Sequence, residues 1–451
     1  MNRPLRVAVI GAGPAGIYAA DHLIKASETV TVDIFDKLPT PYGLIRYGVA
    51  PDHPRIKEIV KALFRILDNP RIRFIGNVSY GEDVKPEELS RFYDATVIST
   101  GAEKDRSLDI PGIDLQGSFG GADFASWFNG HPDVPRDWPL EAKEVAVIGA
   151  GNVAVDVARI LAKTADELLV TEIPDNVYQA LKKSPVTDVL VFSRRGPGQV
   201  KFTPQELREL DHSPNVEVIV HPEGIEFDEA SLQAMRDTRH IKMCVDILQN
   251  WAVRDPRDRP RRLHLYFLQA PVEVLGEDGK VVGLRTETQE LTGDGWVRGT
   301  GEFTDWDVQA VYRAVGYLSS ALPDLPFDTR TGTIPHAGGR VMDLDGEHIP
   351  GMYVAGWIKR GPVGLIGHTK GCSGETVASL IEDQTTERLP LAPEGDDQNA
   401  PVAYLEQRGL PITTWAGWQL LDAFEIALGE PHGRNRVKVV DRDEMTRISR
   451  G

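Results

Sequence analysis

This chain of 451 residues contains two glycine-rich segments of the same kind, each preceded by an apolar run. The first, residues 7–16, reads V-A-V-I-G-A-G-P-A-G, and the second, residues 145–154, reads V-A-V-I-G-A-G-N-V-A. Both predict a buried strand, a tight turn and a helix start, where a pyrophosphate can approach backbone N–H groups. One such motif is weak evidence, because an ordinary strand–turn–helix of an α/β core also explains it. Two copies in the full context predict two Rossmann-like dinucleotide-binding domains.

The strands expected after the two glycine turns end in opposite charges. The strand at residues 31–35 is followed by Asp36, whose carboxylate can accept hydrogen bonds from ribose hydroxyls. The strand at residues 189–192 is followed, after one serine, by Arg194 and Arg195. Arginine at this place suits a 2′-phosphate, so we expect the second site to prefer NADP over NAD. The chain is therefore expected to hold two dinucleotides.

Composition excludes several classes of protein. The formal net charge of −17 argues against nucleic-acid binding, so any basic docking surface must be local. No apolar run approaches the roughly 20 residues that span a bilayer, and no signal peptide is expected, which together predict a cytoplasmic protein without membrane association. Cys244 and Cys372 are the only cysteines, and neither belongs to a C-x-x-C motif. This excludes the usual thiol–disulfide centre of flavoproteins and a four-cysteine iron–sulfur centre, and we expect no metal site.

Turn and strand signals predict that one domain is inserted into the other. An apolar strand at residues 93–102 ends in T-G-A and is followed by I-P-G, which is typical of the exit from an FAD half-domain. A similar strand end at residues 308–317 closes the inserted part, and residues 351–357 return to the first domain. We therefore expect an α/β fold in which an NADP-binding Rossmann-like domain is inserted into an FAD-binding one. The expected boundaries are 1–104 and 321–388 for the FAD domain, 105–320 for the NADP domain, and 389–451 for a C-terminal extension on the FAD domain.

Two further segments show helical patterns. Residues 55–67 have apolar residues at helical spacing and a basic opposite face, which predicts one amphipathic helix with a solvated charged side. The extension after residue 389 contains an acidic, proline-containing stretch and two short helical patterns.

Four longer segments are more specific. They read L-P-T-P-Y-G-L-I-R-Y-G-V-A-P-D-H-P (38–54), G-A-G-N-V-A-V-D-V-A-R-I-L (149–161), F-T-P-Q-E-L-R-E-L (202–210) and A-G-W-I-K-R-G-P-V-G-L-I-G (355–367). They resemble the corresponding segments of adrenodoxin-reductase-type ferredoxin–NADP reductases, and the resemblance spans nearly the whole chain. It implies non-covalently bound FAD and electron transfer from NADPH to a ferredoxin.

The resemblance also implies site residues. The FAD contacts would be Gly11, Gly13, Ala15, Asp36, Leu44, Val78, Trp357, Gly364, Leu365 and Ile366. The NADP contacts would be Arg106, Gly151, Asn152, Val153, Ala154, Arg194, Arg195, Glu206 and Gly364. Asp36 departs from the glutamate usual in the family, which shortens the reach to the ribose by one methylene. Many other FAD reductases have Gly-Asp where this chain has Gly356-Trp357, which counts against the disulfide-reductase branch.

Hydride transfer from nicotinamide C4 to flavin N5 needs stacked rings but no protein nucleophile. Catalytic residues are therefore expected only to tune the flavin, and the candidates are His53, Glu209 and Asp156. Each has an alternative role. His53 could cap a turn, Glu209 could be a helix-surface acid paired with Arg208 or its neighbours, and Asp156 could interact with the helix dipole.

Two other functions stay open, together with the docking site. The chain could be an NADPH-dependent flavoprotein reductase for a quinone or a synthase partner, or a redox-sensing flavoprotein, although a sensor has no need to select a 2′-phosphate. For a small acidic ferredoxin, the densest basic surface is residues 254–262, with five arginines against two aspartates. The helix carrying Arg236, Arg239 and Lys242 would extend it. Alternatively, the arginines at 254–262 are solvated loop charges or structural partners of the excess acids.

Overall fold

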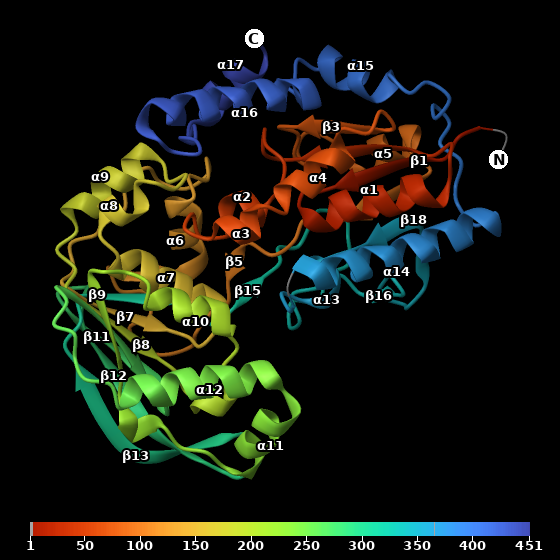
Figure 1. The fold of residues 1–451 in the computed structure, drawn as a ribbon. Helices are drawn as coiled ribbons and strands as arrows, with labels where there is room; N and C mark the ends of the chain where they lie inside the picture. The colour runs from red at the N-terminus through yellow and green to blue at the C-terminus, as the bar shows by residue number, and fades with distance from the viewer. Residues whose placement is uncertain (1–2, 365) are drawn as a thin grey trace. The chain divides into compact units, whose positions relative to one another are not determined.

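The computed structural model describes residues 3–364 and 366–451. The chain divides into two compact units. Figure 1 colours the chain by residue number, from red at the N-terminus to blue at the C-terminus. Unit 1 comprises Met1–Val49, His53–Lys104 and Tyr317–Gly451, and unit 2 comprises Ala50–Asp52 and Asp105–Gly316. Two short strands lie where the chain leaves and re-enters unit 1, namely β5 (Lys104–Asp105) and β15 (Tyr317–Leu318).

Unit 1 is built on a sheet with the strand order β16-β17-β18-β4-β1-β2-β3-β19. Its centre is parallel, because β1 pairs in parallel with β2 and β4, and these pair in parallel with β3 and β18. Every residue of β1 is buried, as expected for a parallel strand covered on both faces. The strands are β1 (Arg6–Ile10), β2 (Thr31–Asp36), β3 (Ile72–Gly76), β4 (Ala95–Ile98), β16 (His336–Ala337), β17 (Arg340–Met342), β18 (His348–Val354) and β19 (Thr413–Thr414).

The helices of unit 1 begin with α1 (Pro14–Ala26), which starts directly at the first glycine turn. Its first residue is proline, whose fixed φ suits the first turn of a helix. Helix α1 packs against α14 (Ile366–Thr385), so segments far apart in the sequence lie side by side (Figure 1). The other helices of this part are α2 (Leu44–Tyr47), α3 (Pro54–Lys57), α4 (Val60–Leu67), α5 (Pro86–Phe92) and α13 (Trp357–Arg360).

The prediction of one amphipathic helix over residues 55–67 is wrong. The chain forms α3 and α4, separated by a turn at Glu58 and Ile59. Helix α4 buries Leu63 and Leu67, whereas α3 buries none of its residues. Helices in proteins are stabilised mainly by packing of an apolar face. The longer helix α4 has such packing, whereas α3 ends after four residues.

The C-terminal extension is more helical than its two short patterns predicted. It forms α15 (Ala400–Gln407), α16 (Trp415–Gly429) and α17 (Arg442–Ser449). Thr414 is the N-cap of helix α16, and its side chain accepts a hydrogen bond from the Gly417 N–H. The whole extension belongs to unit 1.

Unit 2 contains a parallel sheet with the order β6-β14-β7-β8-β10-β9 and a separate antiparallel sheet, β11-β12-β13. The antiparallel sheet has no counterpart among the elements expected from the sequence. The parallel strands are β6 (Ser118–Gly120), β7 (Glu144–Ile148), β8 (Asp188–Phe192), β9 (Val216–Val220), β10 (Arg261–Tyr266) and β14 (Ala310–Arg313). The antiparallel strands are β11 (Gln269–Glu277), β12 (Lys280–Leu291) and β13 (Val297–Trp306).

Helix α7 (Asn152–Ala162) of unit 2 follows the second glycine turn, as α1 follows the first in unit 1. Both units therefore have the parallel strand–turn–helix arrangement expected of Rossmann-like domains. The remaining helices are α6 (Gly121–Phe128), α8 (Ala165–Leu168), α9 (Asp175–Lys183), α10 (Pro204–Leu210), α11 (Glu229–Asp237) and α12 (Arg239–Ala252), together with the 3₁₀ helices η1 (Pro197–Gln199) and η2 (Pro222–Gly224). None of the helices in the described part of the chain combines the length and apolar character that a membrane crossing requires.

Candidate dinucleotide-binding sites

The glycines of the first turn have different neighbours. Gly11 has a φ of +108°, and a Cβ there would lie 2.6 Å from the Ser99 carbonyl oxygen. A Cβ at Gly16 would lie 2.0 Å from the Gly11 carbonyl oxygen. At Gly13 the nearest described atom to a Cβ is the Gly43 Cα, at 4.0 Å. The fold itself therefore requires Gly11 and Gly16, whereas Gly13 faces space in which a phosphate can approach the backbone.

Asp36 lies at the end of β2, beside this turn. Its Oδ2 accepts a hydrogen bond from the Ala12 N–H at 2.7 Å, and its Oδ1 accepts one from the Leu38 N–H at 2.9 Å. Burial raises the pKa of Asp36 to about 6, although these two N–H groups act in the opposite direction. Hydroxyl donors from a ribose would favour the ionised carboxylate further. The residues of the turn thus fit the ribose and diphosphate of a dinucleotide.

The A-G-W segment (residues 355–357), which follows strand β18, lies beside the same glycine turn. Gly356 has a φ of +79°, and a Cβ there would lie 2.6 Å from the Ala15 Cβ. The Ser373 hydroxyl donates a hydrogen bond to the Ala15 carbonyl oxygen at 2.8 Å. Trp357 follows as the first residue of α13, and its ring centroid lies 6.1 Å from that of Tyr317. Unit 1 therefore brings Ala15 and the Gly356-Trp357 pair together.

The L-P-T-P-Y-G-L loop approaches the turn from another side. Tyr42 has a φ of +83°, which is unusual for a residue other than glycine. Its N–H donates to the Ala12 carbonyl oxygen at 2.8 Å. A Cβ at Gly43 would lie 3.1 Å from the Gly13 Cα, so the two glycine backbones lie close together. Leu44, the first residue of α2, follows Gly43 directly in the chain.

The remaining FAD candidates are less well defined. Val78 has a buried side chain, and its N–H donates to the Asp36 carbonyl oxygen at 2.9 Å. Gly364 is exposed and has a φ of +88°. Leu365 lies outside the described residues, as does the side chain of Ile366, whose backbone begins α14.

The second turn repeats the pattern of the first. Gly149 has a φ of +150°, and a Cβ there would lie 2.4 Å from the Ala314 carbonyl oxygen. No described atom lies within 4 Å of a Cβ at Gly151. Ala154, which replaces the third glycine, is fully buried, and Val153 is half-buried. The middle glycine is again the one that faces open space.

Two further NADP candidates connect α7 to α10. The Asn152 side-chain oxygen accepts a hydrogen bond from the Thr203 N–H at 3.1 Å. Glu206 is buried, and its Oε2 accepts from the same N–H at 3.1 Å, which completes a capping box at the start of α10. Both side chains therefore have a structural partner beside the turn.

The cations expected at the 2′-phosphate are held unequally. Arg194 is exposed, whereas Arg195 is half-buried. The Arg195 guanidinium carbon lies 5.7 Å from the centroid of the Trp296 ring. Trp296 lies in the loop between β12 and β13, far along the chain from both glycine-rich segments, so no sequence motif indicates this contact. Arg106 is exposed, and its N–H donates to the Gly316 carbonyl oxygen at 2.8 Å.

The tuning candidates of unit 2 surround a buried ion-pair cluster. Arg159 binds the Asp52 carboxylate with two hydrogen bonds of 2.7 Å, and it lies 2.9 Å from Asp156. Burial alone would lower the pKa of Arg159, but Asp52 and Asp156, with a contribution from Glu209, hold it above its ordinary value. Lys163 binds Asp52 as well, at 2.8 Å. Asp156 therefore acts on a buried arginine rather than only on the helix dipole, and no sequence motif indicates this cluster.

Glu209 and His53 are the two remaining tuning candidates, and the contact of Glu209 with a neighbour on its own helix agrees with the surface-acid alternative. Glu209 is half-buried, and its Oε1 accepts a hydrogen bond from Gln205 at 3.3 Å. His53 is buried and precedes α3, but within the described residues its side chain accepts no capping hydrogen bond from this helix. Among the described residues, no three His, Cys, Asp or Glu side chains are grouped so that they could hold a metal ion.

The arginines at residues 254–262 are all engaged with other protein groups. Arg254 and Arg257 bind Asp211 and Glu217, and Arg262 binds Asp188 with hydrogen bonds of 2.5 and 2.6 Å. The other two donate to backbone carbonyl oxygens, Arg259 to Ser213 and Val216 and Arg261 to Ala162 and Lys163. These contacts favour the structural alternative over a free docking surface.

Comparison with known proteins adds independent findings. A family described as pyridine nucleotide-disulphide oxidoreductase matches residues 5–190, a range that contains neither cysteine of the chain. The NADPH-ferredoxin reductase FprA of Mycobacterium tuberculosis is 42% identical over 470 residues, covering 100% of both chains. The mitochondrial NADPH:adrenodoxin oxidoreductase of Arabidopsis thaliana is 38% identical, covering 98% of this chain and 95% of its own. A structure of M. tuberculosis FprA in complex with NADPH superposes with a TM-score of 0.92 at 41% identity, covering 100% of both chains.

Proposed function

The chain belongs to the adrenodoxin-reductase-type ferredoxin–NADP reductases, and we propose that it passes electrons from NADPH through FAD to a ferredoxin, with FAD held by unit 1 and NADPH by unit 2. One observation carries the assignment of the two sites. In each unit a Cβ at the middle glycine of the turn would meet no described atom closer than 4.0 Å, and the following strand ends in an acid in unit 1 and in two arginines in unit 2. The family membership confirms the resemblance recognised in the sequence.

The residues of unit 1 bind and orient FAD, which when bound accepts a hydride and releases electrons singly. The N-terminus of α1 carries positive partial charge for the diphosphate, with Gly11, Gly13 and Ala15 at the turn. Asp36 accepts hydrogen bonds from the ribose hydroxyls, and the backbone near Val78 lies on the adenine side. Leu44, Trp357 and the segment from Gly364 to Ile366 hold the isoalloxazine end.

The residues of unit 2 bind NADPH. Residues 151–154 hold the diphosphate at the N-terminus of α7, with Arg106 and Glu206 as further contacts. Arg194 and Arg195 recognise the 2′-phosphate.

Loss of the two arginines tests the coenzyme assignment. Each charge-assisted hydrogen bond to a phosphate is worth roughly 1.5–3 kcal/mol. The double variant Arg194→Ala/Arg195→Ala is therefore expected to raise the KM for NADPH by on the order of a hundredfold or more and to change that for NADH little. Equal losses for the two coenzymes would contradict the assignment. Ferricyanide serves as the electron acceptor, so that docking of ferredoxin does not enter.

A second experiment separates the ferredoxin reductase from the alternatives. The purified protein should be yellow, and denaturing precipitation should release one FAD per chain. Steady-state NADPH oxidation should then rise strongly when ferredoxin is added. A quinone reductase would respond to quinone instead, and a sensor would not turn over.

His53, Glu209 and Asp156 are proposed to tune the flavin rather than to react covalently. Two observations support this role: His53 is buried, and the charges of Asp156 and Glu209 help to raise the pKa of the buried Arg159. His53→Ala and Glu209→Ala should keep both coenzymes bound and alter the rate of flavin reduction in stopped-flow experiments. Unchanged rates in both variants would leave a purely structural role.

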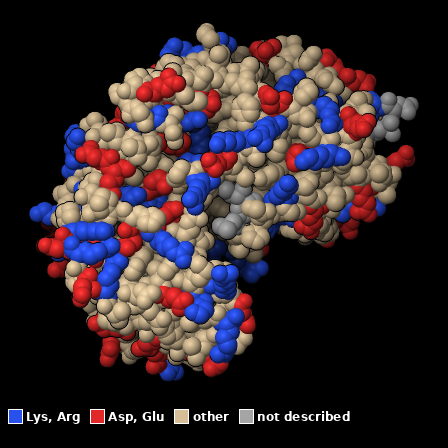
Figure 2. Space-filling view, viewed as in Figure 1, with Lys and Arg blue, Asp and Glu red and all other residues tan. Residues whose placement is uncertain are grey.

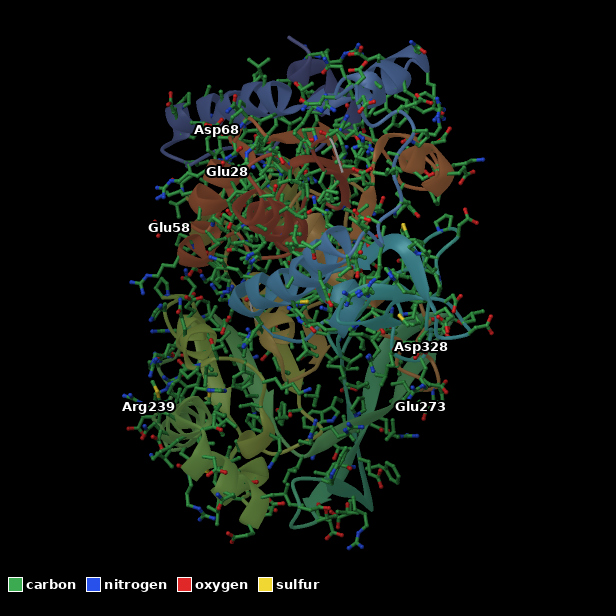
Figure 3. All side chains as sticks on the ribbon, turned by 90° about the vertical axis from the view of Figure 1, so that its right-hand side faces the viewer. Glu28, Glu58, Asp68, Arg239, Glu273 and Asp328 are labelled. Atoms are coloured by element: carbon green, nitrogen blue, oxygen red, sulfur yellow. The ribbon has the colours of Figure 1, made fainter. Side chains whose placement is uncertain are left out.

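Ferredoxin is proposed to dock on a local basic patch formed by α11 and the start of α12. Its cations are Arg236, Arg239 and Lys242, and all three side chains are exposed. Arg236 pairs with Glu229 at 2.7 Å and Lys242 with Asp246 at 2.8 Å, whereas Arg239 forms no ion pair with any described residue. The Arg239 side chain extends outward from α12 (Figure 3). The ion pairs of Arg236 and Lys242 are exposed, whereas the arginines at 254–262 bind half-buried or buried protein groups. We therefore place the docking patch on α11 and the start of α12.

A cytoplasmic location is proposed as well. Both cysteines are free, which is usual in a reducing compartment. Fractionation of cells that express the protein tests this location.

A further inference from the structure

A tryptophan outside both glycine-rich segments lies against Arg195, one of the two arginines proposed to bind the 2′-phosphate. Trp296 is the last residue of the tip of the β12–β13 hairpin (residues 292–296), and its side chain is 62% exposed. The Arg195 guanidinium carbon lies 5.7 Å from its ring centroid, within the range of a cation–π contact. Arg194, the neighbouring cation, is exposed and has no such aromatic contact among the described residues. One cation of the pair is therefore held by a ring, and the other is not.

The hairpin tip is itself held by α11, beside which it lies (Figure 1). The Gly295 N–H donates to the Asp228 Oδ2 at 3.0 Å, and the Ala230 N–H donates to the Gly293 carbonyl oxygen at 3.3 Å. Within the tip, the Trp296 N–H donates to the Asp294 Oδ1 at 3.1 Å. The backbone that carries Trp296 is thus tied to the N-terminal end of α11.

The loop that follows the arginines is tied to the same end of α11. The Ser231 N–H donates to the Asp228 Oδ1 at 2.8 Å, and the Gln199 side chain donates to the Ser231 hydroxyl at 2.6 Å. A Cβ at Gly198 would lie 2.7 Å from the Ser231 Cβ, so η1 packs closely on α11. The Arg195 carbonyl oxygen accepts a hydrogen bond from the Ser193 hydroxyl at 2.9 Å. Asp228 and Ser231 therefore connect the arginine loop with the hairpin tip.

We propose that Trp296 is a positioning residue for coenzyme selectivity, which orders the Arg195 side chain for the 2′-phosphate of NADP. The inference rests on the proposed role of Arg195. A long side chain loses rotamer freedom when it binds a phosphate, and a contact that restricts it beforehand reduces this cost. Trp296 acts through Arg195 and need not touch the coenzyme. The anchored hairpin keeps the ring in place while the indole stays open to solvent.

Two nucleotides that differ only in the 2′-phosphate test the proposal on the FAD-loaded protein. Adenosine 2′,5′-bisphosphate carries the group, and adenosine 5′-monophosphate lacks it. Trp296→Ala should raise the Kd of the bisphosphate about two- to fivefold, the size of an exposed cation–π contact, and leave that of the monophosphate unchanged. Trp296→Phe keeps a ring face and should restore most of the affinity. Phe303→Ala is the matched control, because Phe303 is an exposed aromatic residue of β13 in the same hairpin.

A double-variant cycle shows whether Trp296 acts through Arg195. In an Arg195→Ala background, Trp296→Ala should cause no further loss of bisphosphate affinity. An additive loss, or an equal loss for both nucleotides in Trp296→Ala, would overturn the inference. If Arg195→Ala weakens the bisphosphate and Trp296→Ala does not, the inference fails while the proposed function stands. If Arg195→Ala leaves the two affinities unchanged, the assignment of the 2′-phosphate site fails as well.

Discussion

At the residue scale, the glycines of the first turn serve two different purposes, and alanine separates them. Gly13→Ala places a methyl group no nearer than 4.0 Å to a described atom, so the unfolding free energy of the apoprotein should stay within roughly 0.5 kcal/mol of the parent. The same methyl group occupies the space expected for the FAD diphosphate, so FAD affinity should fall strongly. Urea unfolding of the apoprotein and flavin fluorescence titration measure the two effects.

Gly16→Ala is the matched control for this prediction. Its Cβ would lie 2.0 Å from a backbone oxygen, so it should destabilise the apoprotein by about 1–3 kcal/mol. Gly151→Ala offers the same comparison in unit 2, where NADPH affinity should fall and FAD content should not. Parent-like FAD binding by Gly13→Ala would show that the diphosphate lies elsewhere.

Asp36 predicts a pH dependence of FAD binding. In the ligand-free protein, burial raises the pKa of Asp36 to about 6. A carboxyl whose pKa is raised on folding stabilises the fold at low pH, and this contribution is lost as the pH rises through about 6. FAD binding has the opposite dependence, because ribose hydroxyls donate to the ionised form. FAD affinity should therefore be constant above pH 7 and fall by up to tenfold per pH unit below about pH 6.

Fluorescence titration of the apoprotein with FAD between pH 5 and 8 checks this dependence. Asp36→Asn cannot ionise, so it should bind FAD more weakly and lose most of the pH dependence. An unchanged pH profile in this variant would assign the titration to another group.

At the scale of elements, the C-terminal extension holds the loop that approaches the first glycine turn. Arg46 of α2 and Glu425 of α16 form a buried ion pair, with hydrogen bonds of 3.0 and 2.5 Å. The Glu425 Oε1 also accepts from the Val439 N–H at 2.9 Å, and Lys438 donates to the Arg46 carbonyl oxygen at 2.8 Å. Helix α2 begins at Leu44, so the extension fixes the backbone that faces Gly13.

Removal of one partner should therefore be costly. Glu425→Ala leaves a buried arginine without its main counter-charge, and we expect a loss of about 3–5 kcal/mol in unfolding free energy together with weaker FAD binding. The double variant Arg46→Met/Glu425→Leu should recover much of the stability, because neither charge is then buried alone. Chemical denaturation of the three proteins checks this. A single variant that costs less than about 1 kcal/mol would contradict the role of the pair.

At the scale of the whole molecule, charge decides how an acidic partner can approach. The net charge of −17 repels an acidic ferredoxin at long range, and Figure 2 shows Lys and Arg side chains interspersed with Asp and Glu side chains over the face in view. Arg254 and Arg262 are poor sites for charge reversal, because their partners Glu217 and Asp188 are buried and would lose their counter-charge.

Reversal of the exposed cations is the cleaner test of docking. Arg236→Glu/Arg239→Glu/Lys242→Glu should slow the ferredoxin reaction and flatten its salt dependence, because steering acts on the association rate and is screened beyond roughly 8–10 Å. Reduction of ferricyanide needs no docking and should change little in the same variant. Stopped-flow rates over a series of salt concentrations measure both, and an unchanged salt slope would move the patch elsewhere.

The two strand–turn–helix units and the opposite charges that follow them are readable from the amino-acid sequence without coordinates. These features depend on residues close together in the chain, since a glycine turn, its strand and the next strand end follow local spacing. Asp36 and the Arg194-Arg195 pair could therefore be read without coordinates. The resemblance added residues such as Trp357 that local spacing does not connect with the first turn.

The partners of these residues, by contrast, become visible only in the folded chain. The division of residues 55–67 into two helices depends on which face is packed, and the neutralisation of the arginines at 254–262 depends on carboxylates from other strands and loops. The contact of Trp296 with Arg195 joins segments about a hundred residues apart through a sheet with no motif of its own. Such contacts are decided by packing over long sequence separations, because burial and charge pairing act between surfaces that exist only once the chain is folded.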